Sequence, residues 1–242
     1  FGVTGLSYGF DFKAVAARKN AVVEQLRGGV EGLLGHKLIT LVRGKAAFKD
    51  AHTVVVTSSP VMSSEVETSE YSADYIIIAT GSVSASLPIP GADLPGILTS
   101  REILDLEEVP QRLCVIGGGV IGLEFASVFR SFGSEVTVLE YFKEILPRFD
   151  SDLSKRLKQS LGKRGIEINT QAQVTAIEET DGGYKVSFTR KGKEEVIEAD
   201  KVLMAVGRKA NVGSLNLADV GLEFTPRGIV VDEKTMQTNI PH

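Results

Sequence analysis

The spacing of apolar residues predicts a long helix near the start of the chain. Between Asp11 and His36 apolar side chains recur three and four residues apart, which places them on one helical face. We expect this face to lie on a neighbouring surface. Gly28 and Gly29 interrupt the pattern at a cost of roughly 1 kcal/mol each relative to alanine. They indicate either a bent or frayed helix or the close approach of another backbone or a ligand.

The pattern changes to short β-rich runs after this helix. Three runs separated by polar turns predict a small antiparallel meander, and they cover residues 38–42, 46–48 and 53–57. A further run, 74–79, is uninterruptedly apolar after Asp74 and leads into Thr80-Gly81. An unbroken apolar strand is typical of a buried parallel sheet, and ligands bind at the carboxyl edge of such sheets.

The most informative pattern begins as an apolar run, 113–116, breaks into glycines and then becomes amphipathic. It predicts a strand, a tight turn and a helix from Val120 to about Ser131. Gly117, Gly119 and Gly122 form G-x-G-x-x-G, in which glycine permits positive φ and close approach of a ligand to the backbone. Unpaired N–H groups and the positive dipole end of the helix would then hold a pyrophosphate.

A second buried strand is predicted directly after this helix. Gly133 ends the helix, and the β-rich run 135–140 finishes in the carboxylate of Glu140. Glu140 lies about twenty residues past the glycines, where the dinucleotide fingerprint places an acid that binds the adenosine ribose. Strand, glycines, helix, strand and acid together predict a dinucleotide site.

The remaining elements predict a doubly wound α/β sheet over residues 85–211. Thr99 and Glu102 form a capping box for a short helix, 101–106, and Asp150 or Ser151 caps a helix that Gly165 closes. Alternating runs predict an inserted antiparallel meander with turns at 181–183 and 191–192. The predicted strands are 166–168, 173–179, 184–190, 194–199, 202–206 and 229–231, and the predicted second helix is 152–163.

Composition and charge narrow the class of protein. The 242 residues carry a net charge of −4 without long runs of one sign, which argues against binding to nucleic acid or an anionic membrane. The apolar run Leu113–Leu123 is too short and too rich in glycine to cross a bilayer. The single cysteine, Cys114, cannot form a disulfide within the chain, and we expect it to pack in the core. We expect a cytoplasmic location or a comparable compartment.

Several motifs together resemble the flavin-dependent pyridine nucleotide-disulfide oxidoreductases, and most of all the members that oxidise dihydrolipoamide. The resemblance covers nearly the whole chain in the family's order and spacing. The matching segments are Leu26–Val30, Ile78–Ser82, Val115–Glu124, Val138–Glu140, Ala205–Arg208 with Asn211, and the tail Gln237–Pro241.

The resemblance implies two cofactors and a division into domains. Residues 1–84 and 212–242 would belong to an FAD-binding domain and residues 85–211 to an NAD-binding domain. Glu124 would be either a charge near the nicotinamide or an ordinary acid of the helix surface. The NAD-binding residues would be Gly117, Gly118, Gly119, Val120, Ile121, Gly122, Leu123, Glu124, Glu140, Val174 and Gly207. The FAD-binding residues would be Thr80, Gly81, Ser82 and Ala46, the last standing where the family has a glycine.

Other features of the family are absent from these residues. They are its first FAD fingerprint, its redox Cys-x4-Cys, a later glycine-aspartate FAD motif and a histidine-glutamate base. We expect this chain to be a piece of a longer protein that carries them, with no catalytic residue among these 242. His36 and His52 have no carboxylate motif around them and are interpreted as surface residues.

The resemblance implies that NAD, FAD and a redox disulfide would together oxidise dihydrolipoamide. The partners would be a lipoyl domain of a 2-oxo acid dehydrogenase or glycine cleavage complex, and a second copy in a homodimer. The compartment would be the cytoplasm, or a mitochondrial matrix or plastid. Two alternatives stay open: a related reductase acting on glutathione, mercuric ion or oxygen, and a nucleotide-binding module without turnover. The charge of Glu140 predicts NAD rather than NADP.

Overall fold

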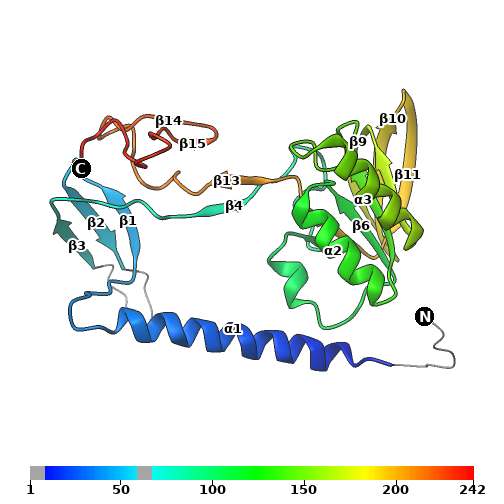
Figure 1. Cartoon of the computed structure of the whole chain (residues 1–242), viewed down its shortest axis with the longest axis horizontal. Helices are drawn as coiled ribbons and strands as arrows, with labels where there is room; N and C mark the ends of the chain where they lie inside the picture. Colours follow the sequence, from blue (N-terminus) through cyan, green and yellow to red (C-terminus); the bar gives the residue numbers. More distant parts are fainter. Residues whose placement is uncertain (1–8, 59–66) are drawn as a thin grey trace. The chain divides into compact units, whose positions relative to one another are not determined.

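The computed structural model describes residues 9–58 and 67–242 and divides the chain into two compact units (Figure 1). The first unit contains Ser84–Gly207 together with the chain up to Gln25. The second unit contains Leu26–Val83 and Arg208–His242.

A five-stranded parallel sheet forms the centre of the first unit. Its order is β5-β12-β6-β7-β8, so the chain leaves the central strand β6 toward one side and later returns on the other. In such sheets the reversal, here between β6 and β12, is where ligands bind. The strands are β5 (Ile97–Leu98), β6 (Arg112–Ile116), β7 (Glu135–Glu140), β8 (Ile166–Thr170) and β12 (Lys201–Met204). The predicted α/β class is confirmed.

Each face of this sheet is covered by a different layer. Helices α2 (Val120–Ser131) and α3 (Ser151–Lys163) contribute to one core, while the antiparallel meander contributes to the other. Alternate side chains of β6 serve the two cores, since Val115 packs toward the helices and Ile116 toward the meander. The unbroken apolar pattern therefore reflects burial on both faces. The meander consists of β9 (Ala172–Thr180), β10 (Gly183–Arg190) and β11 (Lys193–Ala199).

The predicted ends of the elements in this unit are largely confirmed. The Asp150 carboxylate caps α3 by accepting the Asp152 N–H at 2.9 Å. Gly133 and Gly165 follow the two helices with φ of 101° and 82°. The Thr99 N–H donates to Glu102 at 2.8 Å as expected, although the helix that follows is a 3-10 turn, η1 (Glu102–Asp105).

The second unit is built around a smaller sheet and a smaller core. Strands β1 (Lys45–Phe48), β2 (Thr53–Thr57) and β3 (Thr68–Ser72) form an antiparallel sheet in that order. The buried residues of its core are Phe48, Leu215, Leu217 and Leu222. Two-stranded pairs join β4 (Ser82–Ser84) to β13 (Arg208–Ala210) and β14 (Phe224–Thr225) to β15 (Gly228–Ile229).

The prediction of a strand at 38–42 is wrong. These residues are outside any strand, and the third strand of the sheet is β3 instead. β3 pairs along the free edge of β2, with Ser72 opposite Thr53 and Thr68 opposite Thr57. Every residue of β3 is exposed, so this strand is held by its hydrogen bonds to β2 and not by apolar burial. Its sequence therefore has no hydrophobic pattern from which a strand could be predicted.

The predicted buried strand at 74–79 is also wrong. Ile76 and Ile78 pack against the core of the second unit, whereas Ile77 is 91% exposed. A strand exists only where another strand bonds along it, and no described strand pairs with this segment. The apolar composition of this segment alone therefore did not show whether it forms a strand.

Helix α1 (Phe12–Leu34) is present as predicted, but most of its apolar face does not lie on a neighbouring surface. Its first half contacts the first unit: the Phe12 ring lies 6.2 Å from that of Phe129 and 5.2 Å from that of Phe132, and Lys19 Nζ donates to Asp105 at 3.3 Å. Farther along, Leu26 and Leu33 are 66% and 74% exposed. None of its described residues is buried.

Candidate dinucleotide-binding site

The three glycines after β6 serve three separate physical roles. Gly117 has a φ of +113°, and a Cβ there would lie 2.4 Å from the Ala205 carbonyl oxygen, just past β12. A Cβ on Gly122 would lie 2.1 Å from the Gly117 carbonyl oxygen. The first glycine thus permits the turn beside the neighbouring strand, and the third permits α2 to pack tightly on that turn.

Gly119 differs from the other two because no contact among the described residues requires a glycine there. A Cβ built there meets no atom within 4 Å, and its φ of −80° suits any residue. It is the N-cap of α2, yet no side-chain hydrogen bond caps this end. The first N–H groups of a helix have no partner inside it, so this open position fits an anion such as a pyrophosphate.

The peptide groups of Gly118 are held on both sides. Its N–H donates to Glu140 Oε2 at 2.6 Å, and its carbonyl accepts the Leu146 N–H at 3.0 Å. The neighbouring Gly117 N–H donates to the Leu139 carbonyl at 2.8 Å. The turn is therefore preorganised by the end of β7 and the loop that follows it.

Glu140 lies at this turn, as the fingerprint predicts. It is only 5% exposed, and its second oxygen, Oε1, accepts the Phe142 N–H at 2.7 Å. Each carboxylate oxygen can accept two hydrogen bonds, so each retains one acceptor site. Glu140 therefore organises the loop in addition to the ribose contact predicted for it.

The structure places the other predicted NAD residues in different surroundings. Leu123 and Val174 are 5% and 7% exposed and pack in the two cores, so their side chains serve folding. Val120 and Glu124 are exposed on α2 and Ile121 is half-buried. Gly207 has a φ of +124° with open space at its Cβ position, and its carbonyl accepts the Ala85 N–H at 2.9 Å.

In the second unit the predicted FAD segment meets a motif that lies far away in sequence. Arg208 Nε donates to the Ser82 hydroxyl at 2.8 Å. The Asn211 N–H donates to the Gly81 carbonyl at 3.0 Å, and its side-chain amide donates to the Thr80 carbonyl at 3.3 Å. Ala46 belongs to β1, where it is paired with Val56. The fold thus brings Thr80–Ser82 together with Arg208 and Asn211.

Sequence reasoning missed two aromatic residues beside the site. Tyr141 and Phe142 directly follow Glu140, are 64% and 54% exposed, and stand edge to face with ring centroids 5.5 Å apart. The Phe142 carbonyl accepts the Gln171 N–H at 3.0 Å. The sequence feature that could have identified them is their position immediately after Glu140.

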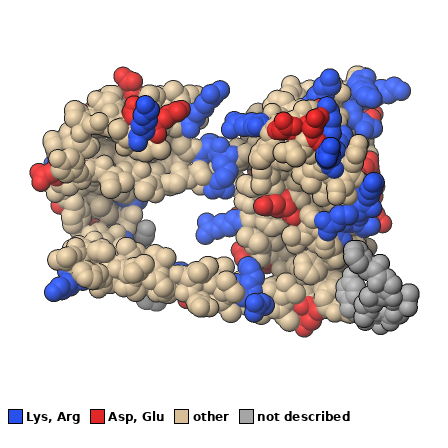
Figure 2. Space-filling view, in the orientation of Figure 1, with Lys and Arg blue, Asp and Glu red and all other residues tan. Residues whose placement is uncertain are grey.

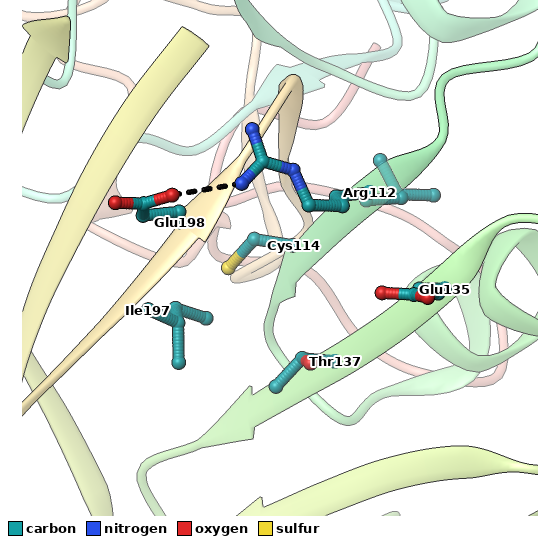
Figure 3. Close-up of a pocket in the computed structure, with 7 residues that line it drawn as sticks. Arg112, Cys114, Glu135, Thr137, Ile197 and Glu198 are labelled. Carbon is teal, nitrogen blue, oxygen red and sulfur yellow. Dashed lines mark hydrogen bonds and ion pairs between the residues drawn. The ribbon is translucent and has the colours of Figure 1, made fainter. Parts of the chain in front are cut away.

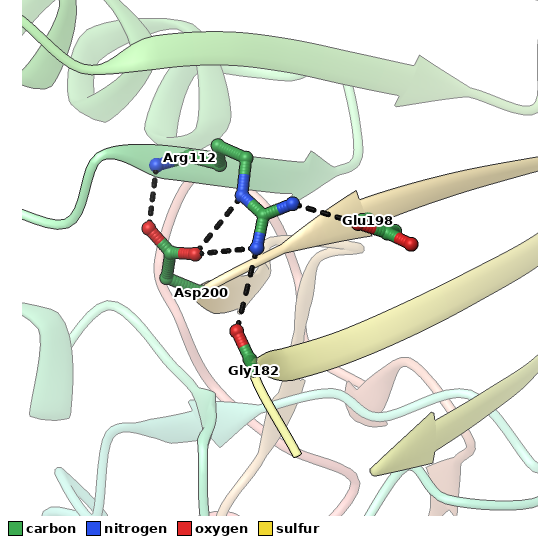
Figure 4. Close-up of polar contacts among 4 residues, drawn as sticks. All are labelled: Arg112, Gly182, Glu198 and Asp200. Carbon is green, nitrogen blue, oxygen red and sulfur yellow. Dashed lines mark hydrogen bonds and ion pairs between the residues drawn. The ribbon is translucent and has the colours of Figure 1, made fainter. Parts of the chain in front are cut away.

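A polar cluster lies at the opposite end of β6 from the glycines (Figure 4). Arg112 donates to Asp200 at 2.8 Å from Nη2, to Glu198 at 2.8 Å from Nη1 and to the Gly182 carbonyl at 3.3 Å. Burial alone would raise the pKa of Asp200, but hydrogen bonds and charge from Arg112 hold that pKa below its ordinary value. The cluster fastens the meander to the start of β6.

A small pocket beside this cluster is lined in part by Cys114 (Figure 3). Cys114 is 1% exposed, and burial raises the pKa of its thiol. A neutral buried thiol is a poor nucleophile, and the prediction that Cys114 packs in the core is confirmed. The pocket lies away from the glycine turn and forms no part of the candidate site.

Charges of both signs are interspersed on the visible face (Figure 2). Within residues 9–58 and 67–242, no group of three or more His, Cys, Asp or Glu side chains could hold a metal ion. None of the helices in those ranges is both long and apolar enough to cross a membrane.

The parallel sheet, its reversal beside β6 and the three-glycine turn define an α/β protein of the Rossmann type. The family described as pyridine nucleotide-disulphide oxidoreductase matches residues 5–242. The chain belongs to this family.

Curated relatives agree with this assignment. A dihydrolipoyl dehydrogenase of Staphylococcus aureus is 39% identical over 240 residues, which is 99% of this chain and 50% of the relative. That of Bacillus subtilis is 39% identical over 242 residues, again covering 50% of the relative. The one from Acholeplasma laidlawii is 39% identical and is covered over 68% of its length. The chain thus spans about half the length of the first two relatives.

Solved structures show the same likeness. The HOCl-induced flavoprotein disulfide reductase RclA from Escherichia coli aligns with a TM-score of 0.82 and 33% identity, over 96% of this chain and 51% of that one. Its Cu(II) complex aligns with a TM-score of 0.83 and 34% identity, over 94% of this chain and 50% of that one.

Proposed function

We propose that this chain binds NAD at the glycine turn and supplies the nucleotide-binding part of a dihydrolipoyl dehydrogenase. The observation that carries the proposal is Gly119, a helix N-cap whose missing side chain leaves space that no protein atom uses. The names of the curated relatives support the activity of the whole enzyme. In that activity NAD and FAD would supply the hydride and electron transfer, and the protein would supply position and electrostatics.

Each part of the turn would have its own role toward the nucleotide. The N-terminal N–H groups of α2 and the helix dipole would bind the pyrophosphate at Gly119. Glu140 and Leu146, by holding the Gly118 peptide on both sides, would keep those N–H groups aimed at the phosphates. Since these hydrogen bonds are made entirely within the protein, binding would require little reordering of the turn.

Glu140 would also select NAD over NADP. A carboxylate about 4 Å from a 2′-phosphate is repelled by roughly 4 kcal/mol per charge pair at an effective dielectric of about 20. Glu140 also accepts hydrogen bonds from two backbone N–H groups, so its replacement is expected to weaken the binding of both NADH and NADPH. The ratio of NADPH to NADH affinity is therefore the readout, and Glu140→Gln should shift that ratio toward NADPH by about tenfold.

We further propose that residues 1–84 and 212–242 contribute to an FAD-binding domain and residues 85–211 to the NAD-binding domain. The core that Phe48 shares with Leu215, Leu217 and Leu222 supports a shared role for residues 1–84 and 212–242. Ala46 would lie near the same cofactor. The lipoyl partner, the homodimer and a cytoplasmic, mitochondrial or plastid location follow from the same proposal.

A second candidate is a flavoprotein disulfide reductase with another electron acceptor. The similarity to RclA, which is described as an HOCl-induced flavoprotein disulfide reductase, supports this second candidate. The chain has one cysteine, which is buried, so these 242 residues alone cannot provide a redox disulfide for either activity. Lipoamide-dependent NADH formation by this chain alone would contradict that conclusion.

Substitution of Gly119 tests the nucleotide site directly. Gly119→Ala should fold normally, because its methyl group meets no protein atom, yet weaken NADH binding by about tenfold or more, or ~1.4 kcal/mol. Isothermal titration calorimetry measures the affinity and circular dichroism the fold. The matched control is Gly162→Ala in α3, where a Cβ also meets nothing within 4 Å and binding should be unchanged. Equal NADH affinity in native and Gly119→Ala chains would overturn the proposal.

A further inference from the structure

Phe142 presents a large apolar ring at the surface on a backbone that cannot move freely. Its N–H donates to Glu140 Oε1 at 2.7 Å, and its carbonyl accepts the Gln171 N–H at 3.0 Å. The ring nevertheless remains 54% exposed, with Tyr141 edge-on to it. The chain thus holds the backbone of Phe142 in place while leaving its ring at the surface.

The second of these hydrogen bonds comes from a specialised corner. Gln171 has a φ of +58°, in the left-handed region that non-glycine residues rarely adopt. It lies between β8 and β9, and Thr170 before it is paired with Glu140 in the parallel ladder. Phe142 and Gln171 therefore meet at the carboxyl edge of the sheet, the edge at which such folds bind ligands.

One carboxylate connects this ring to the phosphate-binding turn. Glu140 accepts the N–H of Gly118 through one oxygen and the N–H of Phe142 through the other. A dinucleotide with its pyrophosphate at Gly119 and its ribose at Glu140 would extend its base toward the far side of that carboxylate. Tyr141 and Phe142 follow Glu140 directly in the chain, and the Phe142 N–H is bonded to the same carboxylate, so their exposed rings are the nearest apolar surface described along the chain beyond it.

We propose that Phe142 stacks on the adenine base of a dinucleotide and that Tyr141 supports the Phe142 ring from its edge. This inference rests on the NAD site proposed above. A planar base has an apolar π-face, and a phenylalanine whose backbone is already held has only two side-chain torsions to order when its ring covers that face. The contact would recognise the base, separately from the phosphate contact at Gly119.

Substitutions at Phe142 test this contact with AMP and NADH as probes. In isothermal titration calorimetry of the 242-residue chain, Phe142→Ala should weaken both ligands by the same factor, about tenfold, because both carry the base. Phe142→Leu should bind both ligands as weakly as Phe142→Ala, whereas Phe142→Trp should bind them about as tightly as the native chain. Phe149→Ala removes a ring that is 56% exposed in the same loop and should leave both affinities unchanged.

Tryptophan fluorescence provides a readout that a purely structural role would not change. The chain contains no tryptophan, so Phe142→Trp introduces a single reporter. Its emission should be quenched when AMP stacks on it, whereas that of Phe149→Trp should not change.

The outcomes separate this inference from the proposed function. If the native chain binds neither NADH nor AMP, the proposed function fails and this inference fails with it. If the native chain binds both and Phe142→Ala binds them equally well, only the stacking inference is overturned. Weakened binding of NADH without weakened binding of AMP would also overturn it.

Discussion

The two units of the chain bury their apolar residues to very different extents. In the first unit both faces of the parallel sheet are covered, and Val115, Val138 and Leu203 are fully buried. In the second unit the core is small, and Leu33 on α1 and Ile77 remain largely exposed. The candidate NAD site is therefore held by the large buried core of the first unit. The segment assigned to FAD packs on a much smaller core within the described residues.

The largest expected effect contrasts a buried with an exposed leucine. Leu203→Ala opens a cavity in the core of the first unit and should lower the free energy of unfolding by about 2–5 kcal/mol. Leu33→Ala, at a side chain that is 74% exposed, should change it by less than about 0.5 kcal/mol. Urea unfolding followed by circular dichroism measures both. Similar losses in the two variants would show that the units do not differ in this way.

An intermediate effect is expected from the cluster that fastens the meander to β6. The pKa of Asp200 is held below its unfolded value, so its contribution is present above that value, near 3.8, and is lost as the pH falls through the folded pKa. Asp200→Asn should lower Tm by a few degrees at pH 7 and by less at low pH. Thermal unfolding from pH 7 down to pH 3 measures this difference. A difference that stays constant with pH would contradict the assigned role.

The smallest effect is expected at the surface of the second unit. Lys49 Nζ and Glu70 form an ion pair at 2.7 Å, but both side chains are about half exposed, at 52% and 53%. Exposed pairs contribute little because water and salt screen them. Lys49→Ala should therefore leave Tm unchanged within error at both low and high salt. A large, salt-sensitive loss would show that this sheet depends on surface charge.

The outcome of the sequence predictions follows the same division. In the first unit, apolar runs and helical patterns located β6, β7, α2 and α3, because each of these elements packs against a layer within the unit. In the second unit, residues 38–42 and 74–79 are mostly apolar but form no strands. Polar β3, held by hydrogen bonds to β2, carried no such pattern.

The sequence by itself determined the strand β6, the glycine turn, the helix α2 and the acid at the end of β7. These features depend on local backbone freedom and on the spacing of apolar residues along the chain. Only the tertiary structure decided that Gly119 faces open space and that Glu140 joins Gly118 to Phe142. It also joined Arg208 to Ser82 across more than a hundred residues. The reason is physical: these relations depend on which strands become neighbours, and no local pattern encodes that choice.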